Sequence, residues 1–238
     1  MNIITLSDYF KEVGYDYQKD YNDIKTICFY TKTRVGTQYE LEDFVPSRGS
    51  EQTFLIKCIL EKYNAKSFFE IGTGRGTACY AASLCDDIEN VTTIDIVPHD
   101  SKKNEAIGGK PAYVSNKDLY GMIPYEQKSK IDFLHRSNIP QLMSEKAASF
   151  DVCFIDGNHD NPQVILEDYM ICKRLTKTPG VIIWDDYDLD KFKVKDVVDQ
   201  IAKTDTNVTV RLINFRGYMF GTDNPEKTSG TVLMEISA

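Results

Sequence analysis

One short stretch decides how the chain folds: Glu70-Ile71-Gly72-Thr73-Gly74-Arg75-Gly76-Thr77. Its glycines stand at alternate positions directly after an apolar run, which predicts a sharp turn from a buried strand into a helix. Glycine also lets the backbone approach a ligand closely. The spacing Gly-x-Gly-x-Gly differs from the Gly-x-Gly-x-x-Gly that places a pyrophosphate on a helix N-terminus. The turn therefore indicates a ligand site that does not need this phosphate geometry.

Apolar strands and helices alternate on either side of this turn. We expect strands at residues 66–72, 91–97, 130–135, 150–156, 181–184, 208–214 and 230–236, and helices at 50–63, 77–84, 139–147, 162–176 and 191–203. Asn161-Pro162 predicts the start of one helix, with Asn161 as its N-cap. Continuous apolar strands separated by helices are typical of a parallel sheet covered on both faces. The last two strands lack a helix between them, so we predict an α/β, Rossmann-like, seven-stranded sheet whose last strand is antiparallel.

An acid follows the next strand of this series. Asp95 ends that strand, roughly 20 residues beyond the glycine turn. In open α/β sheets ligands bind beyond the carboxyl ends of the strands, where an acid accepts hydrogen bonds from two ribose hydroxyls. Glycine turns and strand-end aspartates also occur without a ligand. The two features in this order nevertheless favour a nucleoside-binding site.

Two later strand ends carry further acids. One reads Ile155-Asp156-Gly157-Asn158-His159-Asp160 and the other reads Trp184-Asp185-Asp186-Tyr187-Asp188. Because they follow successive strands, both are expected to open into the same crevice. Carboxylates gathered there would repel one another without a cation, and hard oxygen ligands favour Mg²⁺, with Mn²⁺ or Ca²⁺ as alternatives. The other interpretation is that each Asp caps the next helix. Asp185 and Asp186 can serve one ion only if the strand ends at Trp184, since successive strand residues face opposite sides.

The composition limits the class of protein. The chain has 238 residues, of which 42% are hydrophobic, and a formal net charge of −8, which suits one domain with a proper core. The negative charge argues against a nucleic-acid partner, because phosphates need a basic face. The six cysteines form no Cys-x-x-Cys pair, which predicts reduced thiols and a cytoplasmic protein. Without a signal peptide or an apolar run of membrane length, we expect no membrane partner.

Two segments stand outside the alternating pattern. Residues 1–48 are expected to form a helical N-terminal cap, and residues 49–238 the α/β domain. The aromatic cap is compatible with covering the site, with a subunit interface in a homo-oligomer, or with simple packing. Residues 98–126 are too long for a simple connection and contain Gly108-Gly109. They are interpreted either as a substrate-covering lid or as a disordered surface insertion.

These motifs resemble the class I S-adenosylmethionine (SAM)-dependent methyltransferases over about residues 48–238. The glycine turn, with Glu70 at its start, is similar to the first motif of that family, and Asp95 matches its ribose-binding acid. Many members carry an acid near the adenine after the third strand, where this chain has Arg136-Ser137-Asn138. SAM carries no phosphate, so the glycine spacing suits it. The resemblance implies cofactor-binding roles for Glu70, Gly72, Thr73, Gly74, Gly76, Asp95, Ser137 and Asp156.

The acidic strand ends resemble a particular branch, the metal-dependent O-methyltransferases of the macrocin and cephalosporin-biosynthesis type, which includes sugar-modifying enzymes. The similarity lies in Asp156-Gly157-Asn158-His159, a helix, Pro179-Gly180 and then Asp185-Asp186-Tyr187. It implies Asp156, Asp185 and Asp186 as ligands of Mg²⁺ or another divalent cation. It also implies catalytic roles for Asp156 and for His159, the latter as general base, although relatives vary at the base.

The expected function is a SAM-dependent, divalent-metal-assisted methyl transfer to a hydroxyl of a small molecule or sugar. The transfer is an in-line displacement, so the acceptor oxygen must be aligned behind the methyl group. A divalent ion lowers the pKa of a bound hydroxyl, and an imidazole can take up the proton. The alternatives are a metal-independent methyltransferase on the same fold and a catalytically silent SAM-binding scaffold protein. A nicotinamide-dependent oxidoreductase is disfavoured by the glycine spacing and the later carboxylates.

Overall fold

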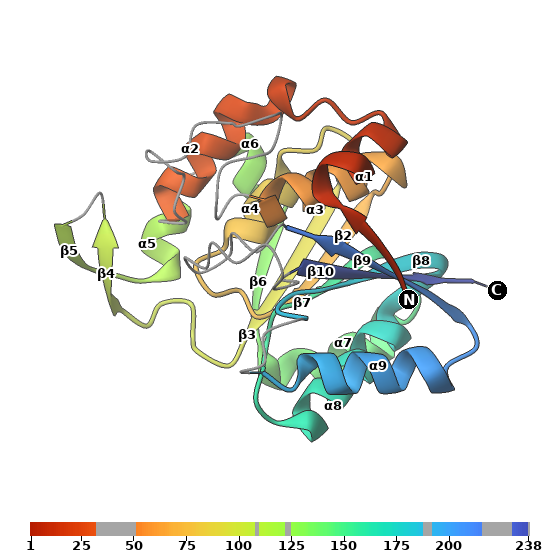
Figure 1. Cartoon of the computed structure of the whole chain (residues 1–238). Helices are drawn as coiled ribbons and strands as arrows, with labels where there is room; N and C mark the ends of the chain where they lie inside the picture. Colours follow the sequence, from red (N-terminus) through yellow and green to blue (C-terminus); the bar gives the residue numbers. More distant parts are fainter. Residues whose placement is uncertain (32–50, 108–109, 122–124, 188–191, 216–229, 238) are drawn as a thin grey trace.

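A mixed sheet forms the centre of the molecule (Figure 1). The computed structural model describes residues 1–31, 51–107, 110–121, 125–187, 192–215 and 230–237. Within this part of the chain the sheet has eight strands, in the spatial order β1 (Asn2–Thr5), β9 (Val208–Asn214), β10 (Gly230–Ile236), β8 (Thr176–Trp184), β7 (Phe150–Ile155), β2 (Ser67–Ile71), β3 (Asn90–Asp95) and β6 (Ile131–His135). β10 is antiparallel to both of its neighbours, and the other pairs are parallel. The predicted α/β class and the reversed last strand are therefore confirmed.

The number of strands differs from the prediction of seven, because the N-terminal segment begins with a strand. β1 pairs in parallel with β9, with Ile3 opposite Leu212, and Ile3 remains 58% exposed. An edge strand of four residues with one face in solvent has too little apolar pattern to be recognised in the sequence.

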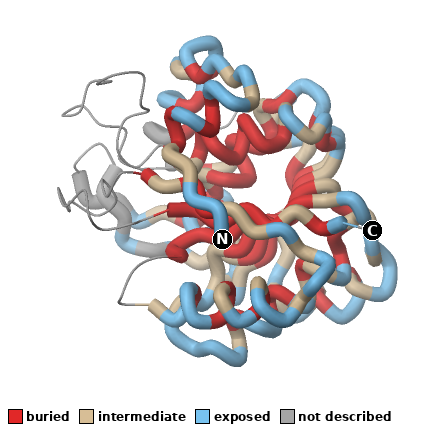
Figure 2. The backbone as a smooth tube through the Cα atoms, turned by 45° about the vertical axis from the view of Figure 1, so that its right-hand side comes forward, coloured by how far each residue is buried: buried red, intermediate tan, exposed pale blue. Residues whose placement is uncertain are grey.

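Helices cover both faces of the sheet, as expected (Figure 1). One layer contains α1 (Leu6–Val13), η1 (Tyr17–Asp20), α2 (Tyr21–Thr31), α3 (Glu51–Lys62) and α4 (Thr77–Ser83), and the other contains α7 (Ile139–Glu145), α8 (Pro162–Leu175) and α9 (Val194–Thr204). Each layer has its own hydrophobic cluster. Phe68 belongs to the first cluster and Phe69 to the second, because successive strand residues point to opposite faces. Buried residues lie in the strands of the sheet and in the helices packed on it, such as α3 and α4, while exposed residues lie mostly on the outside (Figure 2).

The described part of the N-terminal cap packs on the domain. Tyr9, Phe10 and Tyr17 are buried in the first cluster, and the Tyr17 ring meets Phe54 of α3 edge-on at 5.8 Å. Simple packing thus accounts for these aromatic residues. The expected boundary at residue 48 lies outside the described residues.

The segment 98–126 forms regular structure where it is described. It contains the antiparallel pair β4 (Lys103–Ile107) and β5 (Lys110–Val114), then α5 (Asn116–Gly121) and the start of α6 (Tyr125–Lys128). The hairpin projects from the body of the molecule (Figure 1). The alternative of a disordered insertion is therefore wrong for these residues, whereas Gly108-Gly109 lie outside the described part. No helix in the described ranges is long and apolar enough to cross a membrane.

Candidate active site

The glycine turn packs directly against the end of β7. Gly72 has a φ of +97°, and a Cβ at this position would come within 1.9 Å of the Asp156 carbonyl oxygen. Its amide donates a hydrogen bond of 2.8 Å to the carbonyl of Ile94. Only glycine accepts both this conformation and this close approach. The residue therefore brings the ends of β2, β3 and β7 together.

Asp95 holds the same turn from the end of β3. Gly74, at φ +52°, donates its amide hydrogen to Asp95 Oδ2 over 3.0 Å, and the Val97 amide donates to Oδ1 over 2.9 Å. A carboxylate oxygen can accept more than one hydrogen bond. Both oxygens thus keep acceptor capacity for the ribose hydroxyls expected at this place. Gly76, at φ +83°, is the N-cap residue of α4.

Glu70 lies buried beneath the turn in a chain of hydroxyl groups. Thr93 Oγ1 donates to Glu70 Oε2 over 2.6 Å, and Thr73 Oγ1 lies 2.6 Å from Thr93 Oγ1. Burial raises the pKa of Glu70 to about 8, and the nearby charge of Asp95 acts in the same direction. The Glu70 carboxyl is therefore mostly protonated at neutral pH, and it ties β2 to β3 under the turn.

Two adjoining cavities open at this end of the sheet. The first, of about 290 Å³, is lined by Ile71, Gly72, Gly74, Ile94, Asp95, Ile96, Val97, Arg136, Asp156, Gly157, Asn158 and Val164. The second, of about 230 Å³, is lined by Gln52, Thr53, Glu70, Thr73, Gly74, Arg75, Thr77, Ala78 and Asp156. Gly74 and Asp156 line both. The glycine turn and the first acidic strand end thus lie at both of these neighbouring cavities.

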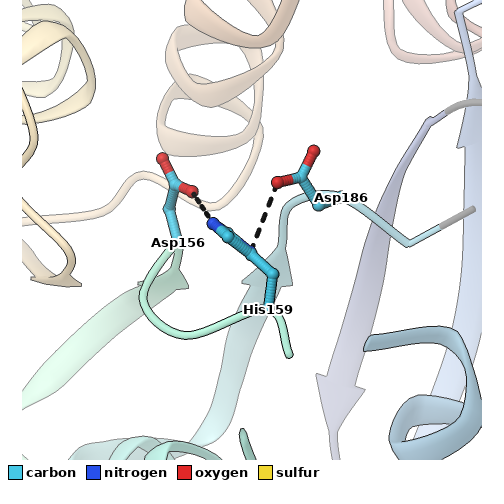
Figure 3. Close-up of side chains that lie close together, drawn as sticks. All are labelled: Asp156, His159 and Asp186. Carbon is cyan, nitrogen blue, oxygen red and sulfur yellow. Dashed lines mark ion pairs between the residues drawn. The ribbon is translucent and has the colours of Figure 1, made fainter. Parts of the chain in front are cut away.

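Asp156, His159 and Asp186 come together beside these cavities (Figure 3). Each offers a ligand atom, and these atoms all lie within 4.8 Å of one another. The imidazole lies between the two carboxylates, with Nε2 3.8 Å from Asp156 Oδ1 and Nδ1 3.3 Å from Asp186 Oδ2. The ring of Phe192 packs against it at 4.9 Å. We name these three residues the acidic cluster.

The two neighbouring acids at the end of β8 have different surroundings. β8 ends at Trp184, as a shared site requires, and Asp186 adopts a left-handed φ of +55°. Asp185 is not part of the acidic cluster; its amide donates to the Ile155 carbonyl over 3.1 Å. Its Oδ1 is buried without a hydrogen bond of normal geometry among the described residues, while the Gln52 side chain is close enough to lower its pKa.

The electrostatics of the site favour a cation. Burial raises the pKa of Asp156, and the charges of Asp185 and Asp186 raise it further. Burial also raises the pKa of Asp185. A cation bound among these groups would favour their charged forms. Oxygen and imidazole donors are ligands that divalent metals accept, so the residues fit such an ion.

The region after β6 departs from the expectation for Ser137. Ser137 is exposed, its Oγ lies 2.8 Å from His135 Nδ1, and it lines neither cavity. Arg136 lines the first cavity instead and pairs with Asp168 of α8 over 2.6 Å. Sequence reasoning missed Arg136, Asp168 and Gln52 as site residues. The one sequence signal that points to this region is that residues 136–138 lack the acid that many members of the family carry there.

Comparison with known protein families supports this fold. A family described as a methyltransferase domain matches residues 69–187, which is half of the chain. The chain therefore belongs to this methyltransferase family. No curated protein sequence matches it.

Solved structures with low sequence identity to this chain share its fold over most of its length. The O-methyltransferase TomG from Streptomyces achromogenes, involved in tomaymycin synthesis and solved with SAM, is 15% identical, covers 90% of this chain and 89% of its own, and superposes with a TM-score of 0.58. An O-methyltransferase from Bacillus cereus in complex with SAH is 13% identical, with coverage of 97% and 96% and a TM-score of 0.55. Both confirm the fold.

Proposed function

We propose that this methyltransferase uses SAM, with the help of a divalent cation, to methylate a hydroxyl group of a small molecule that carries two neighbouring oxygens. The observation that carries the proposal is the position of Asp156. It lines both cavities and belongs to the acidic cluster. A nucleoside bound between Gly72, Gly74 and Asp95 would therefore lie next to the groups that suit a metal.

The nucleoside assignment is supported by the fit of the glycine turn and by the structural relatives. TomG was solved with SAM and the Bacillus cereus enzyme with SAH. In this chain Asp95 is already oriented by two backbone amides, so ribose hydroxyls would meet a fixed acceptor. The second cavity, with Arg75 and Thr77 at the start of α4, would take the amino-acid end of the cofactor or part of the acceptor.

Asp156 and Asp186 are the residues proposed to hold the cation, with Asp185 as the third acid implied by the family resemblance. When bound, the ion supplies a Lewis acid that lowers the pKa of a hydroxyl attached to it. His159 is proposed to take up the proton of that hydroxyl. Its ring nitrogens lie 3.8 Å from Asp156 Oδ1 and 3.3 Å from Asp186 Oδ2, so the base would lie beside the groups that hold the cation.

The acceptor is proposed to chelate the cation through adjacent oxygens, as sugar diols and catechols can. The acids of the site are hard oxygen donors that suit a cation with oxygen ligands, which supports a hydroxylated acceptor over a thiol. Five cysteines are buried free thiols, namely Cys58, Cys79, Cys85, Cys153 and Cys172, which supports the expectation of a reducing compartment such as the cytoplasm.

Two measurements test this function. Titration calorimetry with SAH should show binding that Asp95→Ala weakens about 10- to 100-fold, because the ribose hydroxyls lose a charged acceptor. Unchanged binding would contradict the nucleoside assignment.

Methyl transfer to a panel of catechols and sugar diols should stop with EDTA and return with Mg²⁺ or Mn²⁺. Full activity in EDTA would favour the metal-independent alternative.

A further inference from the structure

His159 stands on a loop, not on a helix or a strand. The loop joins β7 to α8, and Asn158 Oδ1 braces it by accepting hydrogen bonds from the amides of Asp160 and Asn161 over 3.0 and 2.7 Å. These bonds fix the backbone but not the imidazole, because the last side-chain torsion of histidine has a broad, roughly two-fold preference. A base on such a loop therefore requires a further contact that sets the direction of its ring.

The two carboxylates beside the ring do not supply that contact. His159 Nε2 lies 3.8 Å from Asp156 Oδ1, and Nδ1 lies 3.3 Å from Asp186 Oδ2 (Figure 3). Both distances exceed the roughly 2.7 to 3.2 Å of a normal N–H···O hydrogen bond. Both carboxylates are also the groups that are proposed to hold the cation. The ring is therefore oriented by another neighbour.

The start of α9 supplies this neighbour. The amide of Lys193, the N-cap residue of α9, donates a hydrogen bond of 2.7 Å to the His159 carbonyl. The preceding residue, Phe192, places its ring against the imidazole, with the ring centroids 4.9 Å apart and the planes inclined by 39°. A backbone contact and a ring contact thus come from two successive residues and act on the same histidine.

Packing in the core gives only part of the reason for a ring at position 192. Phe192 is half-buried and packs against the second hydrophobic cluster, where an aliphatic side chain of similar size would also be accepted. An aromatic ring differs because it packs against another ring with preferred geometry. An aliphatic side chain has no such plane with which to orient an imidazole.

We infer that Phe192 is a positioning residue, which holds the imidazole of His159 between Asp156 and Asp186. The inference rests on the proposed role of His159 as the base of methyl transfer. A general base has to lie within hydrogen-bond reach of the proton that it removes, and a displacement of about 1 Å can lower turnover by about 100-fold. Phe192 acts through His159 and requires no contact of its own with the cofactor, the cation or the acceptor.

A double-mutant cycle in methyl transfer tests this inference. With catechol or a sugar diol as the acceptor, Phe192→Leu should lower kcat about 10-fold and leave the KM for SAM within about 2-fold. Phe192→Tyr keeps the ring and should retain most of the turnover. In a His159→Gln background, Phe192→Leu should cause no further loss, because no imidazole is left to position. An equal loss in both backgrounds would mean that Phe192 does not act through His159, and the inference would be wrong.

Nuclear magnetic resonance of the imidazole protons gives a readout that does not depend on activity. The chain has three histidines, and the spectrum of His159→Gln identifies the signals of His159. Phe192→Leu should shift these signals, because a neighbouring aromatic ring changes the local magnetic field, and should leave those of His99 and His135 in place. Signals of His159 that do not move would show that the ring contact does not exist, which would overturn the inference.

Controls separate this inference from the proposed function. Ile171→Ala shortens a half-buried apolar side chain that packs against the same cluster, and it should alter neither kcat nor the histidine signals. Full turnover in His159→Gln would remove the proposed base. Full turnover in Phe192→Leu, with His159→Gln inactive, would overturn only the inference. If the unaltered protein methylates neither acceptor, the proposed function itself fails.

Discussion

Gly72 is the residue on which the geometry of the site depends most. A side chain there would overlap the Asp156 carbonyl, at 1.9 Å from the new Cβ, in a conformation with φ of +97°. The end of β2 can lie this close to β7 only without a Cβ. The same contact brings the glycine turn next to the acidic cluster, so one residue links the nucleoside side of the site to the metal side.

Substitution of Gly72 by alanine should destabilise the protein by about 3 kcal/mol or more, because backbone must move to remove the overlap. The free energy of unfolding from urea denaturation measures the change. Gly121→Ala is a matched control, since a Cβ there meets nothing within 4 Å in the described part of the chain. Equal stability of the two variants would show that the turn does not pack as described.

Glu70 should make the stability of the protein depend on pH. The pKa of its carboxyl is about 8 in the folded state against 4.5 as the ordinary value, so the folded protein binds the proton more tightly than the unfolded chain. This contribution is fully present below pH 4.5 and is lost as the pH rises through 8. Between pH 6 and pH 8 the loss should be about 2 kcal/mol. Glu70→Gln should remove this part of the pH dependence of the free energy of unfolding. If the free energies of unfolding of both proteins change with pH in parallel, this acid is not buried as described.

His159 is suited by position to be either a base or a metal ligand, and one variant distinguishes the two roles. His159→Gln should abolish most methyl transfer, by about 100-fold, and leave the affinity for Mn²⁺ nearly unchanged. Calorimetric titration with Mn²⁺ gives the second quantity. A loss of metal affinity as large as the loss of turnover would make His159 a ligand instead.

Residue types that the backbone requires could be predicted from the sequence, and side-chain directions could not. Gly72 and Asp95 are fixed by the turn and by the strand end, and both lie where the spacing placed them. Ser137 and Arg136 are adjacent in the sequence, and nothing in their spacing says which one faces the cavity. The choice is made by Asp168, 32 positions away, through a tertiary contact that the sequence pattern does not reveal.

Elements with strong signals at their ends were predicted closely. α8 begins at Pro162, and Asn161 caps it by accepting a 3.0 Å hydrogen bond from the Gln163 amide. β8 was expected from residue 181 but begins at Thr176. Phe150 and Thr176 are partners, but the register shifts before the next pair, Val152 and Val181. The local break at Pro179-Gly180 thus lies where the pairing is irregular, and the strand resumes its regular ladder at residue 181, where the sequence predicts it.

The cap of α8 also permits a test at the scale of one element. Asn161→Ala should cost about 1 kcal/mol of stability, because the first turn of the helix loses its side-chain acceptor. Thermal unfolding measures this loss, and Lys203→Ala at an exposed position of α9 serves as the control. Asn161→Asp should retain most of the stability. A variant without the cap that melts like the control would mean that α8 is held by packing alone.

At the scale of the whole molecule, the sheet topology brings distant parts of the sequence to one edge. β2, β3 and β7 are parallel neighbours, and β8 lies beside β7. Their carboxyl ends carry the glycine turn, Asp95, Asp156 and the acids at 185 and 186. We propose that a methyl donor and a cation are bound side by side at this edge.

Nuclear magnetic resonance of SAM labelled with ¹³C at its methyl group measures whether the methyl donor and the cation are neighbours. Mn²⁺, a paramagnetic ion that oxygen and imidazole donors accept, relaxes nuclei strongly only at short distance. Bound to the protein, Mn²⁺ should broaden the methyl signal of bound SAM, and Asp156→Asn should remove the effect while SAM still binds. A methyl signal that stays sharp when both SAM and Mn²⁺ are bound would show that the methyl donor and the cation are not bound side by side.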